Sequence, residues 1–282
     1  LDRLYRWAAQ EGLTAEVPFT HRTVWRRGYG GRRAQMAARN NAYEQAPRPS
    51  DVSFVTLDDY RLFRDVGLRG LLPSGLERPG ARDRNGLRNN LFAELLVTTG
   101  LRLEEASFLL ACEVAALNRH ETPDRQAWLK LPDALTKGNR GRSVLVPRRL
   151  LEQMQAYITV ERAAAVAKFQ QRLGWKTIEK PIFVIGRQSR PRLTLRDGSA
   201  IALDRLGPEE RSRAVLCGDD GAPQQPAVLW LTEIGQPVQP NSWEVIFARA
   251  SQRCAVAGSV IQISPHQLRH TLAVHMLAML IQ

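Results

Sequence analysis

The alternation of hydrophobic and polar positions predicts a mainly helical domain. Several stretches place apolar residues three and four positions apart, which is the spacing that gives a helix one buried face. Helix starts are marked by a capping residue followed by acidic residues, or by Ser or Asn next to Pro. The helical stretches are 88–98, 103–110 and 148–173, and further starts lie at Thr56, Pro240 and Pro265.

Shorter stretches alternate with a period of two, and these predict β-hairpins. Residues 128–131 and 143–147 flank a Lys-Gly-Asn-Arg-Gly turn at 137–141, which is typical of two antiparallel strands joined by a tight loop. A second hairpin and a preceding strand are predicted at 193–195, 200–203 and 182–185. The expected fold class is therefore mainly α with small β-hairpins (α+β).

The chain also divides along its length. Residues 1–12 show the spacing of an amphipathic helix, residues 22–50 are rich in Arg with little periodicity, and Ala-Pro-Arg-Pro-Ser at 46–50 is a linker signal. We expect a basic linker over 22–50 and a large domain over 51–282. The first residues, Leu-Asp-Arg-Leu, resemble neither an initiator Met nor a signal peptide, so we expect a trimmed start.

The positive net charge of the chain indicates that the domain binds an anionic polymer. The sequence has 40 Lys and Arg residues and 28 Asp and Glu residues, which gives a formal net charge of +12. Nearly all of the excess basic residues are Arg. Guanidinium groups bind phosphate in two-pronged pairs, so nucleic acid is the expected partner. The sequence holds no apolar run of about 18 residues, so no membrane span is predicted. The three Cys are far apart, which predicts reduced thiols in the cytoplasm.

The start of the last helix carries the strongest chemical signal. Residues 264–267 form a predicted capping box, and His266, Arg269 and His270 then project from the first turns on one face. A helix N-terminus attracts phosphate, so an Arg and an imidazole there would make a phosphate site with a proton carrier. The alternative is that both His are ordinary helix residues; a metal site is weaker still, because no third ligand is evident.

Two earlier pieces could serve the same site. Gly100 ends one helix and Arg102 begins the next, with Glu105 placed to orient a basic group. Lys137 lies in the Gly-rich hairpin turn, from which an ammonium could reach a phosphate. Taken alone, a corner such as that of Gly100 and Arg102 is more often a helix–helix connection with a solvated Arg. A turn such as that of Lys137 is more often an exposed hairpin tip.

In this order the pieces resemble the tyrosine recombinase (phage integrase) family. The resemblance covers residues 51–282, with residues 1–21 similar to the closing helix of the family's separate N-terminal DNA-clamping domain. It rests on Arg88-Asn89-Asn90, Thr99-Gly100-Leu101-Arg102 with Glu105, Thr136-Lys137-Gly138 leading to Val146-Pro147, Leu229-Trp230-Leu231 through Trp243, and Ser264 to Thr271.

The resemblance implies a role for each residue. Arg102 and Arg269 would bind the scissile phosphate, Lys137 would be the general acid, and His266 would hydrogen-bond the phosphate and assist proton transfer. Glu105 and His270 would support them. Apart from the resemblance, we expect Arg140 and Arg142, the basic neighbours of Lys137, to contact the DNA backbone. A tyrosine would form a 3′-phosphotyrosyl link, so no cofactor and no metal is expected. Double-stranded DNA, bound by a homotetramer at the bacterial nucleoid, is the implied partner, with no membrane.

Two features depart from the family pattern. The tyrosines, namely Tyr5, Tyr29, Tyr43, Tyr60 and Tyr157, all precede His266, so we expect the nucleophile beyond Gln282, in a longer protein; a naturally inactive relative stays open. The irregular segment 177–227 also looks like an insertion between the Lys137 hairpin and the helix of Trp243, with no role that the sequence assigns.

Three other readings stay open. The chain could be a non-catalytic DNA-binding protein with a recombinase-like fold, or a relaxing enzyme similar to type IB topoisomerases. A metal-dependent nuclease is opposed by the lack of an acidic cluster that would hold Mg²⁺. The sequence does not identify the DNA site, or distinguish integration, excision, dimer resolution and transposition within a mobile element.

Overall fold

The computed structural model describes residues 9–13, 21–26, 35–40, 54–77, 85–118, 125–187, 192–195 and 197–281. Contacts divide the chain into two units, Leu1–Val52 and Ser53–Gln282. In the first unit, β1 (His21–Arg26) pairs antiparallel with β2 (Gln35–Asn40). The sequence predicted only a linker there, because its hydrophobic periodicity is weak. Most of the helix predicted over 1–12 lies outside the described residues.

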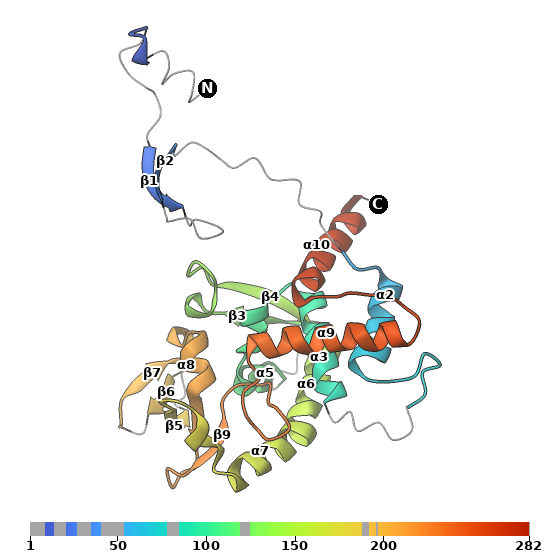
Figure 1. Cartoon of the computed structure of the whole chain (residues 1–282). Helices are drawn as coiled ribbons and strands as arrows, with labels where there is room; N and C mark the ends of the chain where they lie inside the picture. Colours follow the sequence, from blue (N-terminus) through green and yellow to red (C-terminus); the bar gives the residue numbers. More distant parts are fainter. Residues whose placement is uncertain are drawn as a thin grey trace. The chain divides into compact units, whose positions relative to one another are not determined.

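The second unit is mainly helical, as predicted (Figure 1). Turns of π-helix, η1 (Phe63–Leu68) and η3 (Ile158–Arg162), extend two of its helices. The α-helices are α2 (Leu57–Leu62), α3 (Gly86–Thr99), α4 (Leu103–Ser107), α5 (Ala111–Asn118), α6 (Arg148–Tyr157), α7 (Ala163–Gln171), α8 (Pro208–Arg213), α9 (Pro240–Val256) and α10 (Pro265–Ile281). Short 3-10 turns are η2 (Asp133–Leu135), η4 (Gly174–Thr177) and η5 (Leu203–Arg205).

One predicted helix is interrupted. Instead of one helix over 103–110, α4 ends at Ser107 and α5 begins at Ala111. The backbone between them pairs with an extended segment from much later in the chain: the amide of Leu229 donates to the carbonyl of Leu109 at 2.7 Å, and the amide of Ala111 donates to the carbonyl of Ala227 at 3.0 Å. These long-range bonds use the groups that a continuous helix would need.

The described strands of this unit form two sheets. The predicted hairpin is confirmed: β3 (Gln126–Leu131) pairs antiparallel with β4 (Arg142–Pro147). The segment predicted as an insertion holds a five-stranded sheet in the order β7-β6-β5-β8-β9, in which β5 and β8 pair in parallel and the other neighbours antiparallel. Its strands are β5 (Ile182–Arg187), β6 (Arg192–Leu195), β7 (Ala200–Ala202), β8 (Ala214–Cys217) and β9 (Pro223–Pro226).

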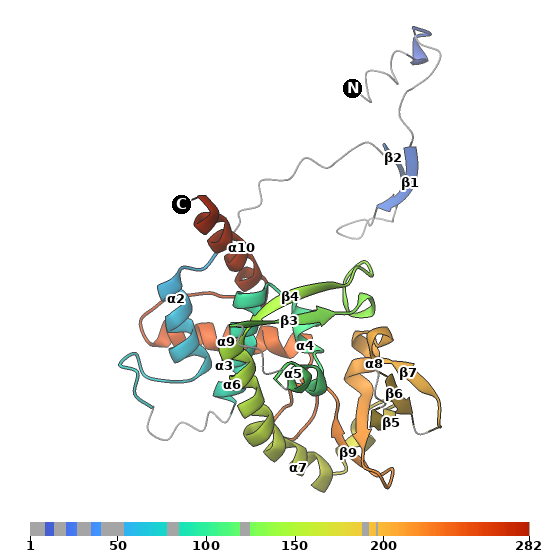
Figure 2. The same ribbon diagram turned by 180° about the vertical axis from the view of Figure 1, so that it is seen from behind.

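The core lies around α3, which is near the middle of the helical layer in Figures 1 and 2. The ring of Phe92 on α3 stacks on Trp243 of α9, with centroids 3.6 Å apart. Trp230 meets Phe92 edge-on at 5.7 Å, and its indole N–H donates to the carbonyl of Ala106 at 2.8 Å. These contacts join α9 and the 227–231 segment to the corner between α3 and α4.

Two buried arginines fasten the five-stranded sheet to this core. Arg211 on α8 is fully buried and forms a two-pronged ion pair with Glu113 of α5, at 2.9 and 2.8 Å. Arg162, which is 3% exposed, donates to the side chain of Gln225 and to carbonyls of Pro226 and Val228. Burial lowers the pKa of Arg162 to about 10, so it stays a cation at neutral pH.

Candidate active site

Arg102 is held at a sharp corner between two helices. α3 ends at Gly100, whose backbone is left-handed (φ 64°, ψ 25°), a conformation that costs glycine little because it has no Cβ. Arg102 follows in extended conformation as the residue that precedes α4, and its amide donates to a carboxylate oxygen of Glu105 at 2.8 Å. Its side chain is 42% exposed, so the guanidinium is anchored but accessible.

The start of α10 brings Arg269 to the same corner. The predicted capping box is confirmed, since the Ser264 amide donates to the Gln267 side chain at 2.8 Å and the Gln267 amide donates to the Ser264 hydroxyl at 3.3 Å. Arg269 donates to the carbonyl of Gly100 at 2.7 Å. One short hydrogen bond thus joins the two arginine motifs across the chain.

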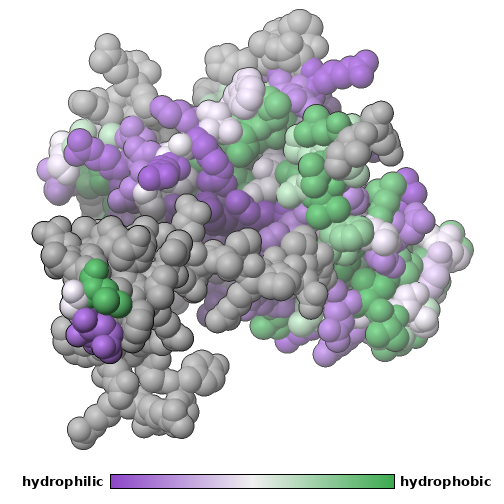
Figure 3. Space-filling model, turned by 90° about the horizontal axis from the view of Figure 1, so that it is seen from above, coloured by the Kyte–Doolittle hydropathy of each residue, from purple (hydrophilic) through white to green (hydrophobic). Residues whose placement is uncertain are grey.

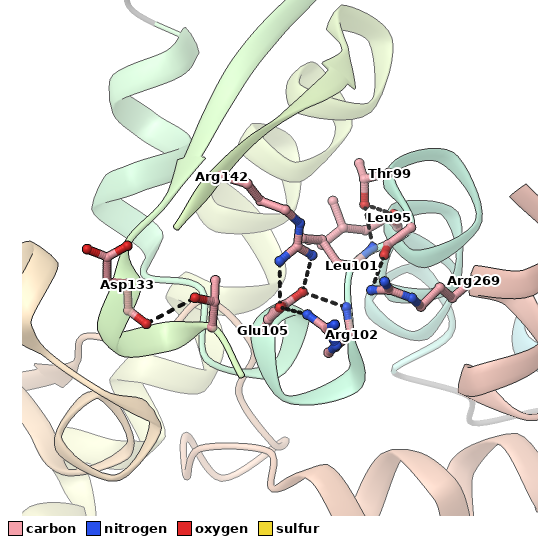
Figure 4. A network of polar contacts seen from close by, with 10 residues as sticks. Leu95, Thr99, Leu101, Arg102, Glu105, Asp133, Arg142 and Arg269 are labelled. Atoms are coloured by element: carbon pink, nitrogen blue, oxygen red, sulfur yellow. Dashed lines mark hydrogen bonds and ion pairs between the residues drawn. The ribbon is translucent and has the colours of Figure 1, made fainter. Parts of the chain in front are cut away.

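A buried carboxylate organises the arginines (Figure 4). Glu105 is 1% exposed and accepts hydrogen bonds from the guanidinium groups of Arg102 and Arg142. Burial raises the pKa of Glu105, but the bonds from Arg142 and Arg102 outweigh it, so this pKa lies below its ordinary value. Burial, and then the charge of Arg102, lower the pKa of Arg269. Two guanidinium groups therefore bind one carboxylate while that of Arg269 binds the Gly100 carbonyl, and the excess of positive charge favours an anion.

Lys137 approaches from the hairpin. It follows Thr136, which is 5% exposed and donates to the carbonyl of Asp133 at 3.0 Å, and it precedes Gly138 with φ 84°. Lys137 is exposed, as is Arg140 further along the turn. The turn is anchored at Thr136 and exposed at Lys137, so the Lys137 ammonium is accessible to a bound ligand.

The predicted catalytic residues share one cavity of about 1050 Å³. Arg102, Lys137, His266 and Arg269 all line it, although they come from α4, the hairpin turn and α10. Its floor is formed in part by Phe247 of α9. Viewed from above, the molecule shows hydrophilic residues in a band beside groups of hydrophobic ones (Figure 3). The cavity combines cationic groups with a proton carrier, as chemistry on a phosphate ester requires.

His266 and His270 form a pair on α10. Their Nε2 atoms are 2.8 Å apart and their rings meet edge-on at 4.4 Å. Burial, then the neighbouring His270 and Arg269, lower the pKa of His266 below 6.5. At neutral pH His266 is therefore a neutral imidazole that can accept or donate a hydrogen bond, and His270 contacts its ring from one helical turn later.

Replacing His270 should change the titration of His266. In His270→Asn the repulsion between two imidazolium rings is removed, so the pKa of His266 should rise toward 6.5. NMR titration of the His side-chain resonances measures it, with His275→Asn, on the same helix, as the control that should leave His266 unchanged. A His266 pKa that stays constant in His270→Asn would show that the two rings are not coupled.

Several features of the site were not evident from the sequence. The carbonyl of Gly100 is the partner of Arg269, and the guanidinium of Arg142 lies on Glu105, although Arg142 was predicted to contact DNA. Among the described residues, no tyrosine lines the cavity. Tyr60 and Tyr157 are both buried, and the hydroxyl of Tyr157 accepts a hydrogen bond from the amide of Leu231 at 3.2 Å.

The fold and the cavity define a mainly helical domain with a cavity lined by several cationic side chains. Residues 78–281 match the phage integrase family, and the chain belongs to that family. No curated protein sequence matches it. No helix in the described part of the chain has the length and apolarity needed to cross a membrane.

Solved structures that resemble the chain include two complexes of the XerH site-specific recombinase. The pre-cleavage complex bound to difH substrate has 11% sequence identity and a TM-score of 0.43, and the match covers 81% of this chain and 44% of that one. The post-cleavage complex bound to palindromic difH substrate also has 11% identity, with a TM-score of 0.40 and coverage of 81% and 43%. The chain therefore matches less than half the length of these structures.

Proposed function

We propose that this chain is the catalytic domain of a site-specific DNA recombinase that cleaves and rejoins strands through a 3′-phosphotyrosyl intermediate. The observation that carries the proposal is the single cavity lined by Arg102, Lys137, His266 and Arg269, in a chain of the phage integrase family. The formal net charge of +12 suits double-stranded DNA as the partner. We further propose that the protein acts on DNA as a homo-oligomer, a tetramer.

In this mechanism the arginines hold the scissile phosphate. Arg102 and Arg269 each donate to a non-bridging oxygen, and their charges stabilise the negative charge that builds up at the five-coordinate phosphorus. Both are anchored before DNA arrives, one on Glu105 and the other on the Gly100 carbonyl. Little reorganisation is then needed when the transition state forms.

Protons move through Lys137 and His266. A tyrosine oxygen attacks phosphorus as its proton passes to neutral His266, the bond to the 5′ oxygen breaks, and Lys137 donates a proton to that oxygen. Neutral His266 hydrogen-bonds the phosphate and assists the transfer. In the reverse step a 5′ hydroxyl attacks the phosphotyrosine and releases the tyrosine, so the phosphodiester bond energy is conserved and no nucleotide cofactor is consumed.

Binding and covalent capture test the proposal together. A duplex site selected from a random pool should bind residues 1–282 with an affinity that falls steeply as salt rises, because bound counterions are released. On a nicked suicide substrate the product of the complete gene should give a covalent adduct. Residues 1–282 alone should give none, since no described tyrosine lines the cavity. Salt-independent binding, or no adduct from the complete product, would contradict the proposal.

A further inference from the structure

We propose that Arg142 is a positioning residue of this site. Its guanidinium binds the carboxylate of Glu105, and this bond holds Arg102 and the hairpin of Lys137 in one arrangement. The inference rests on the proposed function, and it replaces the DNA-backbone contact that the sequence suggested for Arg142. It is carried by the contacts of Glu105, by the backbone next to Arg142 and by the balance of charge.

The carboxylate of Glu105 is fully occupied (Figure 4). Its Oε1 accepts from an Nη of Arg142 at 2.8 Å and from an Nη of Arg102 at 3.0 Å. Its Oε2 accepts from the other Nη of Arg142 at 2.5 Å and from the backbone amide of Arg102 at 2.8 Å. Arg142 thus binds with both prongs, the strongest geometry between guanidinium and carboxylate.

The position of Arg142 in the chain makes this bond a link to Lys137. Arg142 is the first residue of β4, directly opposite Leu131, and it follows the turn that carries Lys137. Just before it, the Gly141 amide donates to the Asp133 side chain at 2.5 Å. A Cβ on Gly141 would lie 2.7 Å from that same oxygen. The backbone there is closely packed, so the hairpin cannot shift without disturbing the Arg142–Glu105 pair.

Charge explains why Arg102 needs this neighbour. Hydrogen bonds that Arg142 donates to Glu105 raise the pKa of Arg142, so both partners stay ionised. With Arg142 in place, Arg102 donates one Nη and its backbone amide to Glu105, and the residue lines the cavity. Without Arg142, a buried carboxylate would lose its two-pronged partner, and Arg102 would turn toward it to compensate. The guanidinium would then be withdrawn from the phosphate.

Arg140 offers a matched control on the same turn. It is exposed, whereas the side chain of Arg142 is 32% exposed and lies on Glu105. An arginine that contacts DNA phosphate contributes to affinity and to its salt dependence. A positioning arginine contributes to the rate of the bound complex.

The experiment compares Arg142→Lys, Arg142→Gln, Arg140→Gln and Arg269→Ala in the complete gene product. Single-turnover cleavage at saturating protein and the Kd for the selected site at several salt concentrations are measured. Lys keeps the charge but not the two-pronged geometry, so Arg142→Lys should lower the cleavage rate about 10- to 100-fold while Kd changes less than about twofold. Arg140→Gln, at an exposed position expected to contact the DNA backbone, should instead weaken binding and reduce the salt slope by about one.

A footprint of the unaltered protein covers the case in which a variant does not fold. Phenylglyoxal should modify Arg140 in the free protein and less when DNA is bound, whereas Arg142 should react slowly with or without DNA. If Arg142 behaves like Arg140 in either measurement, it is a DNA contact and the inference is wrong. If Arg269→Ala cleaves at the normal rate, the proposed function itself fails.

Discussion

Lys137→Ala in the complete gene product should cleave ordinary DNA about 10²- to 10⁴-fold more slowly, the loss expected on removing a general acid. Lys137 lines the same cavity as Arg102 and Arg269, and in the proposed mechanism its ammonium protonates the departing 5′ oxygen. A 5′ thiolate leaves without a proton because its conjugate acid is far stronger. Replacing the bridging 5′ oxygen by sulfur should therefore restore much of the rate of Lys137→Ala.

The comparison of the two substrates makes this result specific. Arg140→Gln, in the same exposed turn, should show no selective recovery with sulfur, because a backbone contact affects both substrates alike. The rates are compared under single turnover, so that affinity does not enter. If sulfur leaves the defect of Lys137→Ala unchanged, the proton comes from another group, and His266 on the same cavity is the next candidate.

Arg211→Leu should lower the free energy of unfolding by about 3–5 kcal/mol, the cost of breaking a buried ion pair by removing one partner. Arg211 has no exposed surface, and besides its ion pair with Glu113 it donates to the carbonyls of Leu206 at 2.9 Å and Phe108 at 3.2 Å. The change to Leu leaves a carboxylate and two carbonyl oxygens without this donor. Urea unfolding of the purified protein measures the loss.

Arg213→Leu, on the same short helix, is the control. Arg213 pairs with Glu209, whose side chain is 81% exposed, and an ion pair open to solvent contributes about 1 kcal/mol or less. Hydrogen exchange should also show that Arg211→Leu exposes the amides of β5, β8 and β9 first, because the five-stranded sheet loses its attachment to α5. Equal losses in the two variants would mean that the buried pair does not hold the sheet.

Local signals in the sequence predicted the elements whose structure is decided locally. The alternation on both sides of a Gly-rich turn identified the hairpin β3–β4, and Ser264 with Gln267 identified the start of α10. Short motifs also identified Arg102, Lys137, His266 and Arg269, which the structure places among the residues that line one cavity.

Features that depend on distant packing could not be predicted in this way. The break between α4 and α5 arises from bonds to residues 227–229, which no local pattern reveals. The direction of Arg142 is decided by a buried carboxylate 37 positions earlier in the chain. An arginine in a basic turn looks the same in sequence whether it faces solvent or Glu105, so its charge alone suggested DNA.

The hydrogen bond between Arg269 and Gly100 joins residues 169 positions apart, and this separation has a consequence for how the protein is made. A ribosome delivers Arg102 and Lys137 well before the helix that carries His266 and Arg269. At about 5–20 residues per second, the intervening chain takes on the order of ten seconds to synthesise. During that interval the nascent domain lacks His266 and Arg269, so the cavity that they line together with Arg102 and Lys137 cannot form until α10 has been synthesised.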